Sequence, residues 1–120
     1  MGVRRVVPNI QASNPEDSRP FYEGFLGLTQ AMDMGWIRTF VSPQNPTAQV
    51  SVLSSDKTAP FHPGLSIEVD NIDEVHAEAL RRGIKIAYPL TTEEWGVRRF
   101  FAVDPNGKVI NIMAHEAPAR

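Results

Sequence analysis

The stretch that decides the fold is WGVRRFFAVDPNGKVIN, residues 95–111. At its centre lies DPNG, residues 104–107, where proline presets φ for the first central position of a turn and glycine tolerates the positive φ of hairpins. Residues 100–103 and 109–112 on either side are rich in β-branched and aromatic side chains, which suit a pleated surface. The stretch therefore predicts two strands joined by a tight turn near the end of the chain.

Two other segments predict helices. The first begins at Asn14, an N-cap residue followed by proline and two acidic residues, and runs to Gly27. Pro20 lies inside it and should kink or delay the helix, because it lacks a backbone donor. The second begins at Asn71 with the spacing of a capping box, and Gly83 follows its end at the position expected of a C′ residue.

The remaining apolar runs predict strands at residues 4–12, 28–33, 36–42, 48–54, 65–69, 84–88, 97–103 and 108–113. The element order is then β-α-β-β-β twice over: a first module of about residues 3–54, a linker at 55–64 and a second module of about residues 65–114. We expect an α+β fold in which two βαβββ modules form curved mixed sheets with helices on the outer face. Because neither half could bury its sheet alone, residues 1–120 should form a single domain, or pack with another subunit.

Composition excludes several classes of function. The chain has a net charge of −2 and no block of Lys or Arg, whereas binding to nucleic acid calls for a basic stripe. No apolar run is long enough to span a bilayer, so we expect no membrane partner. The count of cysteines is 0, which excludes disulfides, thiolate nucleophiles and Cys-type zinc sites and fits a cytoplasmic protein.

Three motifs occur in a characteristic order: Phe21-Tyr22 with Leu26-Gly27-Leu28, the strand-to-helix junction of residues 68–72, and Trp95-Gly96 leading to the turn at 104–107. Over nearly the whole chain they resemble the vicinal-oxygen-chelate superfamily, which includes glyoxalase I, bleomycin-resistance proteins, fosfomycin-resistance transferases and extradiol dioxygenases. The resemblance implies the paired-module fold. It implies no single reaction, because this fold hosts many functions.

The resemblance also bears on metal binding. Metal-dependent members hold their ion with His, Glu or Gln on the first strand of each module and Glu on the last strand. The matching positions here are Val7, Gly64 and Asn111. Valine and glycine offer no donor, and a neutral amide is a much poorer ligand than a carboxylate. We therefore expect no metal and no other cofactor, as in the metal-free bleomycin-resistance-like members.

Other ligand positions remain open. A slip of one or two residues would offer Pro8 or Asn9 on the first strand and His62 near the second position. A site formed by His62, His115 and Glu116 is also conceivable, although nothing in the spacing requires it.

Without a metal, affinity would come from stacking on aromatic rings and from neutral amides that orient the ligand. The candidate ligand-binding residues are Trp95, Trp36, Arg38, Phe40, Asn9, Gln11 and Asn111. Strand alternation places the three amides toward a cavity, and Arg38 could guide an anionic ligand. The alternative is core or dimer packing for the aromatic residues and mutual hydrogen bonding for the amides.

The charged residues Glu93, Glu94, Arg98 and Arg99 are interpreted as solvated surface. The favoured function is a metal-free, dimeric protein that sequesters a flat, partly aromatic compound such as an antibiotic or a toxic metabolite. A second possibility is a metal-dependent lyase, isomerase or dioxygenase with displaced ligands. A third is a metal-free enzyme that uses a cleft acid or Arg38 in acid–base chemistry. Residue chemistry alone leaves these open.

Overall fold

The computed structural model describes residues 2–57 and 59–115 of the chain. Internal contacts divide it into two compact units. The N-terminal unit comprises residues 6–62, and the C-terminal unit combines residues 1–5 with residues 63–120. The boundary at residue 62 falls within the predicted linker. The first strand, β1 (Val3–Gln11), begins in the C-terminal unit and continues in the N-terminal one.

The N-terminal unit has a mixed sheet with the strand order β2-β3-β4-β1. Its other strands are β2 (Thr29–Asp33), β3 (Ile37–Val41) and β4 (Gln49–Leu53). β1 pairs with β4 in parallel, whereas β2, β3 and β4 pair antiparallel. All four strands confirm the predicted ones to within one residue at each end.

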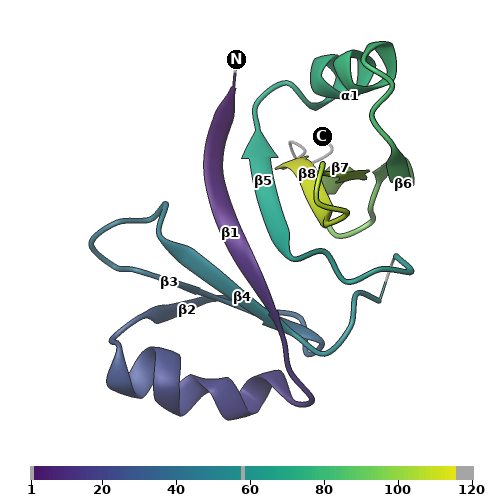
Figure 1. The fold of residues 1–120 in the computed structure, drawn as a ribbon. Helices are drawn as coiled ribbons and strands as arrows, with labels where there is room; N and C mark the ends of the chain where they lie inside the picture. The colour runs from purple at the N-terminus through teal and green to yellow at the C-terminus, as the bar shows by residue number, and fades with distance from the viewer. Residues whose placement is uncertain (1, 58, 116–120) are drawn as a thin grey trace. The chain divides into compact units, whose positions relative to one another are not determined.

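The first predicted helix is interrupted at Pro20. A 3-10 helix, η1 (Pro15–Ser18), is followed by a π-helix, η2 (Pro20–Phe25). Proline is tolerated where it starts the second segment, because a first-turn residue needs no helical N–H partner. The ring of Tyr22 stacks on that of buried Phe40 with centroids 5.4 Å apart, so η2 packs on the face of the sheet that carries Phe40. Figure 1 shows this helical segment beside β2 and β3.

The C-terminal unit has a mixed sheet with the strand order β5-β8-β7-β6. The strands are β5 (Leu65–Val69), β6 (Ile86–Thr92), β7 (Val97–Val103) and β8 (Val109–His115). β6 continues four residues past its predicted end at Tyr88, because Pro89 is tolerated in an edge strand and the pairing with β7 shifts register on either side of Tyr88. β8 also extends further than predicted and includes His115.

The predicted turn joins β7 to β8. Gly107 has a φ of 79°, and the Asp104 carboxylate accepts hydrogen bonds from the backbone N–H groups of Asn106 at 2.8 Å and Lys108 at 2.9 Å. These bonds, that from Lys108 above all, hold the pKa of Asp104 below its usual value. The turn chemistry read from the sequence is therefore confirmed.

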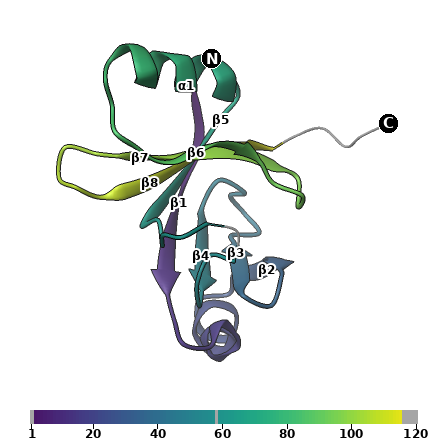
Figure 2. The same cartoon turned by 90° about the vertical axis from the view of Figure 1, so that its right-hand side faces the viewer.

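The helix α1 (Ile72–Arg81) covers one face of the C-terminal sheet, as Figure 2 shows. The core beneath it consists of Val69, Ile72, Ala79, Phe100 and Ala114. Gly83 follows the helix with a φ of 70°, as predicted for a C′ residue. Asn71 occupies the N-cap position, but its side chain makes no capping bond, so the predicted capping box is absent. With one helical segment and a mixed sheet in each unit, the predicted α+β class of two βαβββ modules is confirmed.

Candidate ligand-binding face

The C-terminal sheet has a polar face opposite α1. The register pairs Ser66 of β5 and Phe101 of β7 with Asn111 of β8, and registered side chains lie on the same side of a sheet. Phe100 and Ala114, which belong to the core under α1, point the other way. We call this surface the polar face; it carries Ser66, Glu68, Arg99, Phe101, Asn111, Met113 and His115.

Asn111 lies in the middle of the polar face, and only one of its two side-chain polar atoms has a hydrogen-bond partner among the described residues. Its side chain is 6% exposed, and its Nδ2 donates to the Ser66 hydroxyl at 2.9 Å. Its Oδ1 is buried and has no hydrogen-bond partner among the residues that the structure describes. A buried acceptor without a donor costs about 1–3 kcal/mol. The amide oxygen is therefore an unfilled acceptor, which an N–H or O–H group could reach once the side chains that cover it move aside.

The interpretation of Arg99 and Glu93 as solvated surface charges is wrong, because the structure buries both side chains. Arg99 is 2% exposed and Glu93 is 8% exposed, and Nε of the arginine lies 2.8 Å from Oε2 of the glutamate. Tyr88 donates its hydroxyl to the same oxygen at 2.9 Å. Burial, together with this bond to a carboxylate, raises the pKa of Tyr88. The pair joins β7 to the turn that follows β6.

Aromatic rings surround the Arg99 guanidinium. Its central carbon lies 5.2 Å from the ring centroid of Trp95, 5.4 Å from that of Tyr88 and 4.9 Å from that of Phe101. Such distances allow cation–π attraction. Phe101 is also the registered neighbour of Asn111. The structure thus connects two of the predicted binding residues, Trp95 and Asn111, through Arg99 and Phe101.

A second charged group lies further along the polar face. Glu68 accepts a hydrogen bond from Nε of Arg5 at 2.6 Å and another from Nδ1 of His115 at 2.9 Å. Burial raises the pKa of this carboxyl, but the bond from His115 and the charge of Arg5 outweigh it, and the pKa is lowered overall. Sequence reasoning missed Glu68. His115 could be placed on this face from the sequence, because it is an even number of residues from Asn111 along the same strand.

The amides of the N-terminal unit lie on the sheet face opposite η2. Asn9 is registered with Ser51, which shares a hydrogen bond of 2.7 Å with Thr39. Gln11 donates from Nε2 to the carbonyl of Ser54 at 3.4 Å. As predicted from alternation, the two amides therefore lie away from the helical segment.

Arg38 and Phe40 share a face, as predicted, but it is the face that packs against η1 and η2. Phe40 is 0% exposed beneath Tyr22. Arg38 is bound internally: Nη1 lies 2.7 Å from Oε2 of Glu16 and 3.0 Å from Oδ2 of Asp33. These positions make Phe40 a core residue and Arg38 a paired charge, on the face opposite the amides.

Trp36 precedes β3 and is half-buried, and the carbonyl of Trp36 accepts the backbone N–H of Ser54 at 3.0 Å. Its role as a ligand contact stays a prediction.

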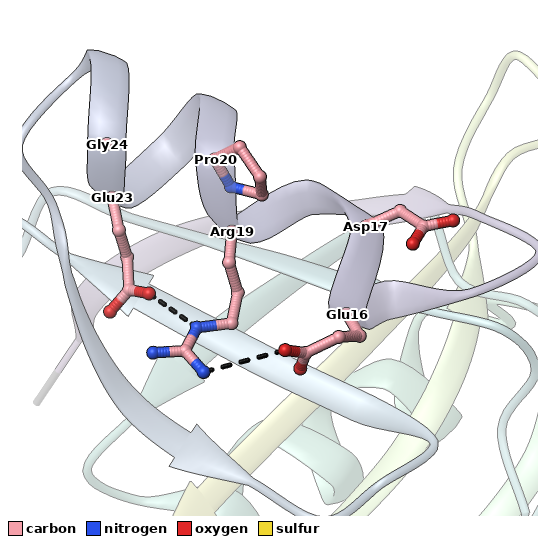
Figure 3. A pocket seen from close by; sticks show the side chains of 6 residues that line it. All are labelled: Glu16, Asp17, Arg19, Pro20, Glu23 and Gly24. Atoms are coloured by element: carbon pink, nitrogen blue, oxygen red, sulfur yellow. Dashed lines mark hydrogen bonds and ion pairs between the residues drawn. The ribbon is translucent and has the colours of Figure 1, made fainter.

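An open pocket of 630 Å³ lies along η1 and η2, lined by Glu16, Asp17, Arg19, Pro20, Glu23 and Gly24. Figure 3 shows Arg19 between two carboxylates, with Nε 2.6 Å from Glu23 and Nη1 3.6 Å from Glu16. The bond from Arg19 lowers the pKa of Glu23. None of the predicted binding residues lines this pocket, and its acidic side chains are already paired or solvated.

The residues at the family's metal positions do not fit a metal ion. Val7 and Gly64 have no donor, and Asn111 offers one neutral oxygen. In residues 2–57 and 59–115 no group of three or more His, Asp or Glu side chains could hold an ion. His62 contacts the carbonyl of Asn9 through Nε2 at 3.2 Å. Glu116, part of the alternative site considered above, lies outside the described residues. Metal independence stays a prediction.

The chain belongs to the Glyoxalase/Bleomycin resistance protein/Dioxygenase superfamily, whose family model matches residues 4–112. This confirms the superfamily named in the sequence analysis, without favouring its bleomycin-resistance branch. A comparison with curated proteins found no match. No helix within the described ranges is long and apolar enough to cross a membrane.

Solved structures share the fold at low identity. The NAD-dependent benzaldehyde dehydrogenase from Legionella pneumophila superposes with a TM-score of 0.75 at 22% identity, covering 92% of this chain and 99% of that one. Methylmalonyl-CoA epimerase from Mycobacterium tuberculosis gives 0.69 at 18% identity, covering 98% and 89%. A superfamily member from Vibrio splendidus gives 0.68 at 15% identity, covering 94% and 99%. At these identities the likeness shows the fold alone.

Proposed function

We propose that this protein binds a small, flat and partly aromatic compound on the polar face, without a metal ion. The observation that carries the proposal is Oδ1 of Asn111, a buried acceptor without a donor among the described residues. Nδ2 of the same side chain is fixed by Ser66, so the amide is oriented before a ligand arrives. Preorganised polar groups of this kind commonly set the orientation of a ligand in an otherwise apolar site.

Aromatic area near this amide supports the same proposal. Trp95 and Tyr88 are half-buried and lie around the Arg99 guanidinium, together with Phe101, which is itself fully buried beside Asn111. Val7 and Gly64 have no side-chain atom that could coordinate a metal ion. Binding energy is therefore expected to come from apolar contact and from hydrogen bonds. Sequestration of an antibiotic or toxic metabolite in the cytoplasm fits such a site.

The test is a screen of aromatic compounds by tryptophan fluorescence, followed by Asn111→Leu. Leucine has nearly the same volume and removes both polar atoms, so the variant should fold as well as the wild type or better. Its ligand affinity should fall about tenfold, because one hydrogen bond in a dry site is lost. Undiminished affinity of a folded Asn111→Leu variant would refute the proposal. Stoichiometric Ni, Zn, Fe, Mn or Co in protein purified without chelators would refute its metal-free part.

We also propose a homodimer. Phe21, Phe25 and Leu26 are exposed on or next to η2, and such apolar side chains are often covered by a second copy. Light scattering at tens of micromolar (~10⁻⁵ M, well above the Kd of a stable dimer) should give the mass of two chains. A monomer mass would contradict this part of the proposal.

A further inference from the structure

His115 and Glu68 form a hydrogen-bonded pair on the polar face. Nδ1 of His115 lies 2.9 Å from Oε2 of Glu68, and the other carboxylate oxygen accepts from Nε of Arg5 at 2.6 Å. The carboxylate is 15% exposed, while the imidazole is 55% exposed. A shielded carboxylate thus anchors a histidine whose ring reaches solvent.

This geometry fixes which nitrogen of His115 can act as a base. A carboxylate whose pKa is lowered is ionised at neutral pH and accepts a proton, so Nδ1 carries the hydrogen. Nε2 then has a lone pair, on a ring that is 55% exposed. A base oriented by a carboxylate behind it is the arrangement by which proteins hold a histidine ready for proton transfer.

Two charged groups surround the imidazole of His115. Glu68 from β5 contacts the ring, and Arg5 from β1 pairs with the other oxygen of the same carboxylate. The residue registered with His115 on β7 is Val97, which is apolar. A proton taken up by His115 therefore adds a positive charge beside a carboxylate, with an uncharged residue across the strand pair.

We propose that His115 accepts a proton from an acidic hydroxyl, phenolic or enolic, of the ligand on the polar face. In this step the O–H bond breaks, the proton goes to Nε2, and the electron pair stays on the ligand oxygen. Glu68 is a positioning residue that stabilises the imidazolium. The inference rests on the proposed function and deepens it by naming the ligand class.

The spacing along β8 sets the length of such a ligand. Asn111 and His115 are four residues apart on one face, and a strand rises about 3.3 Å per residue, so their Cα atoms are separated by about 13 Å. A ligand with an acidic hydroxyl at one end and an N–H donor at the other, joined by two aromatic rings, would reach both residues.

The probe for this inference is 4-(4-aminophenylazo)phenol, because its amino group can donate to Oδ1 of Asn111 and its phenol and phenolate differ in visible spectrum. Its methyl ether has the same shape and no acidic proton, and is the matched control. Both should quench tryptophan fluorescence. Binding to the wild type at neutral pH should raise the phenolate-to-phenol ratio about tenfold, the size expected of one charge-assisted hydrogen bond.

His115→Gln should abolish this spectral change, and Glu68→Gln should reduce it, in variants that still bind the methyl ether. If the ether binds but the spectrum of the bound phenol matches that in buffer, the inference is overturned and the proposed function stands. If neither compound binds, both fail for this ligand class. In the wild type, NMR of the imidazole nitrogens should show hydrogen on Nδ1; hydrogen mainly on Nε2 would overturn the inference even if a variant failed to fold.

Discussion

Arg99 and Glu93 form a buried ion pair, with Nε and Oε2 2.8 Å apart, that ties the middle of β7 to the turn leading into that strand. The same turn carries Trp95, whose ring lies against the Arg99 guanidinium. A charge pair that is almost fully shielded from water therefore determines where an aromatic side chain of the candidate site lies. Loss of the ion pair is expected to lower stability, and loss of the Trp95 ring is expected to lower ligand affinity.

Arg99→Met should lower the free energy of unfolding by about 3–5 kcal/mol, because it leaves the Glu93 carboxylate buried without its partner. Arg98→Met is the matched control. Arg98 is adjacent and also paired, with Nη2 2.8 Å from Asp73, but that carboxylate is 70% exposed. The control should lose no more than about 1 kcal/mol. Urea unfolding of both variants measures the difference, and equal losses would show that burial of the pair contributes little.

Trp95→Ala should weaken binding of a flat aromatic ligand by more than ~2 kcal/mol, because a well-packed aromatic anchor is lost. Arg98→Ala should have little effect, since Arg98 lies on the opposite face of the sheet and pairs with Asp73 of α1. Calorimetry is the suitable measurement, because removing a tryptophan also removes part of the fluorescence signal. If Trp95→Ala kept its affinity and only Asn111 variants lost it, the site would be polar and stacking would play no part.

Glu68 should make the stability depend on pH. Its folded-state pKa is lowered, so the ionised form stabilises the fold above the unfolded-state value of about 4.3, and this contribution is lost as pH falls through the folded-state pKa. Glu68→Gln should therefore reduce the melting temperature at pH 7 and reduce it less near pH 3. Thermal unfolding at both values tests this. A deficit that does not shrink in acid would indicate that packing, and not charge, makes Glu68 important.

The strands and the DPNG turn could be predicted because their signals are local. Alternating apolar residues and the glycine at 107 act within a few positions, and the structure follows them closely. The break at Pro20 was equally local, although the sequence did not predict a 3-10 helix followed by a π-helix.

The candidate site could be predicted only in part, because its contacts join residues distant in the chain. Asn111 and Trp95 came from strand parity and loop position. The Glu68–His115 pair joins residues 47 positions apart, and its existence depends on the parallel pairing of β5 with β8. The burial of Arg99 likewise depends on β6 continuing past Pro89, which local propensity argues against.

The two predicted N-cap residues provide a last test, because only one of them caps through its side chain. Oδ1 of Asn14 accepts the backbone N–H of Glu16 at 3.2 Å. Asn71 makes no capping bond, and both polar atoms of its side chain are buried without a hydrogen-bond partner among the described residues. Asn14→Ala should therefore cost about 1 kcal/mol of unfolding free energy. Asn71→Ala should cost nothing or stabilise the fold, because it removes two unsatisfied polar groups. Chemical unfolding of the two variants, measured side by side, decides the matter: a larger loss for Asn71→Ala would mean that its amide has a partner in solution.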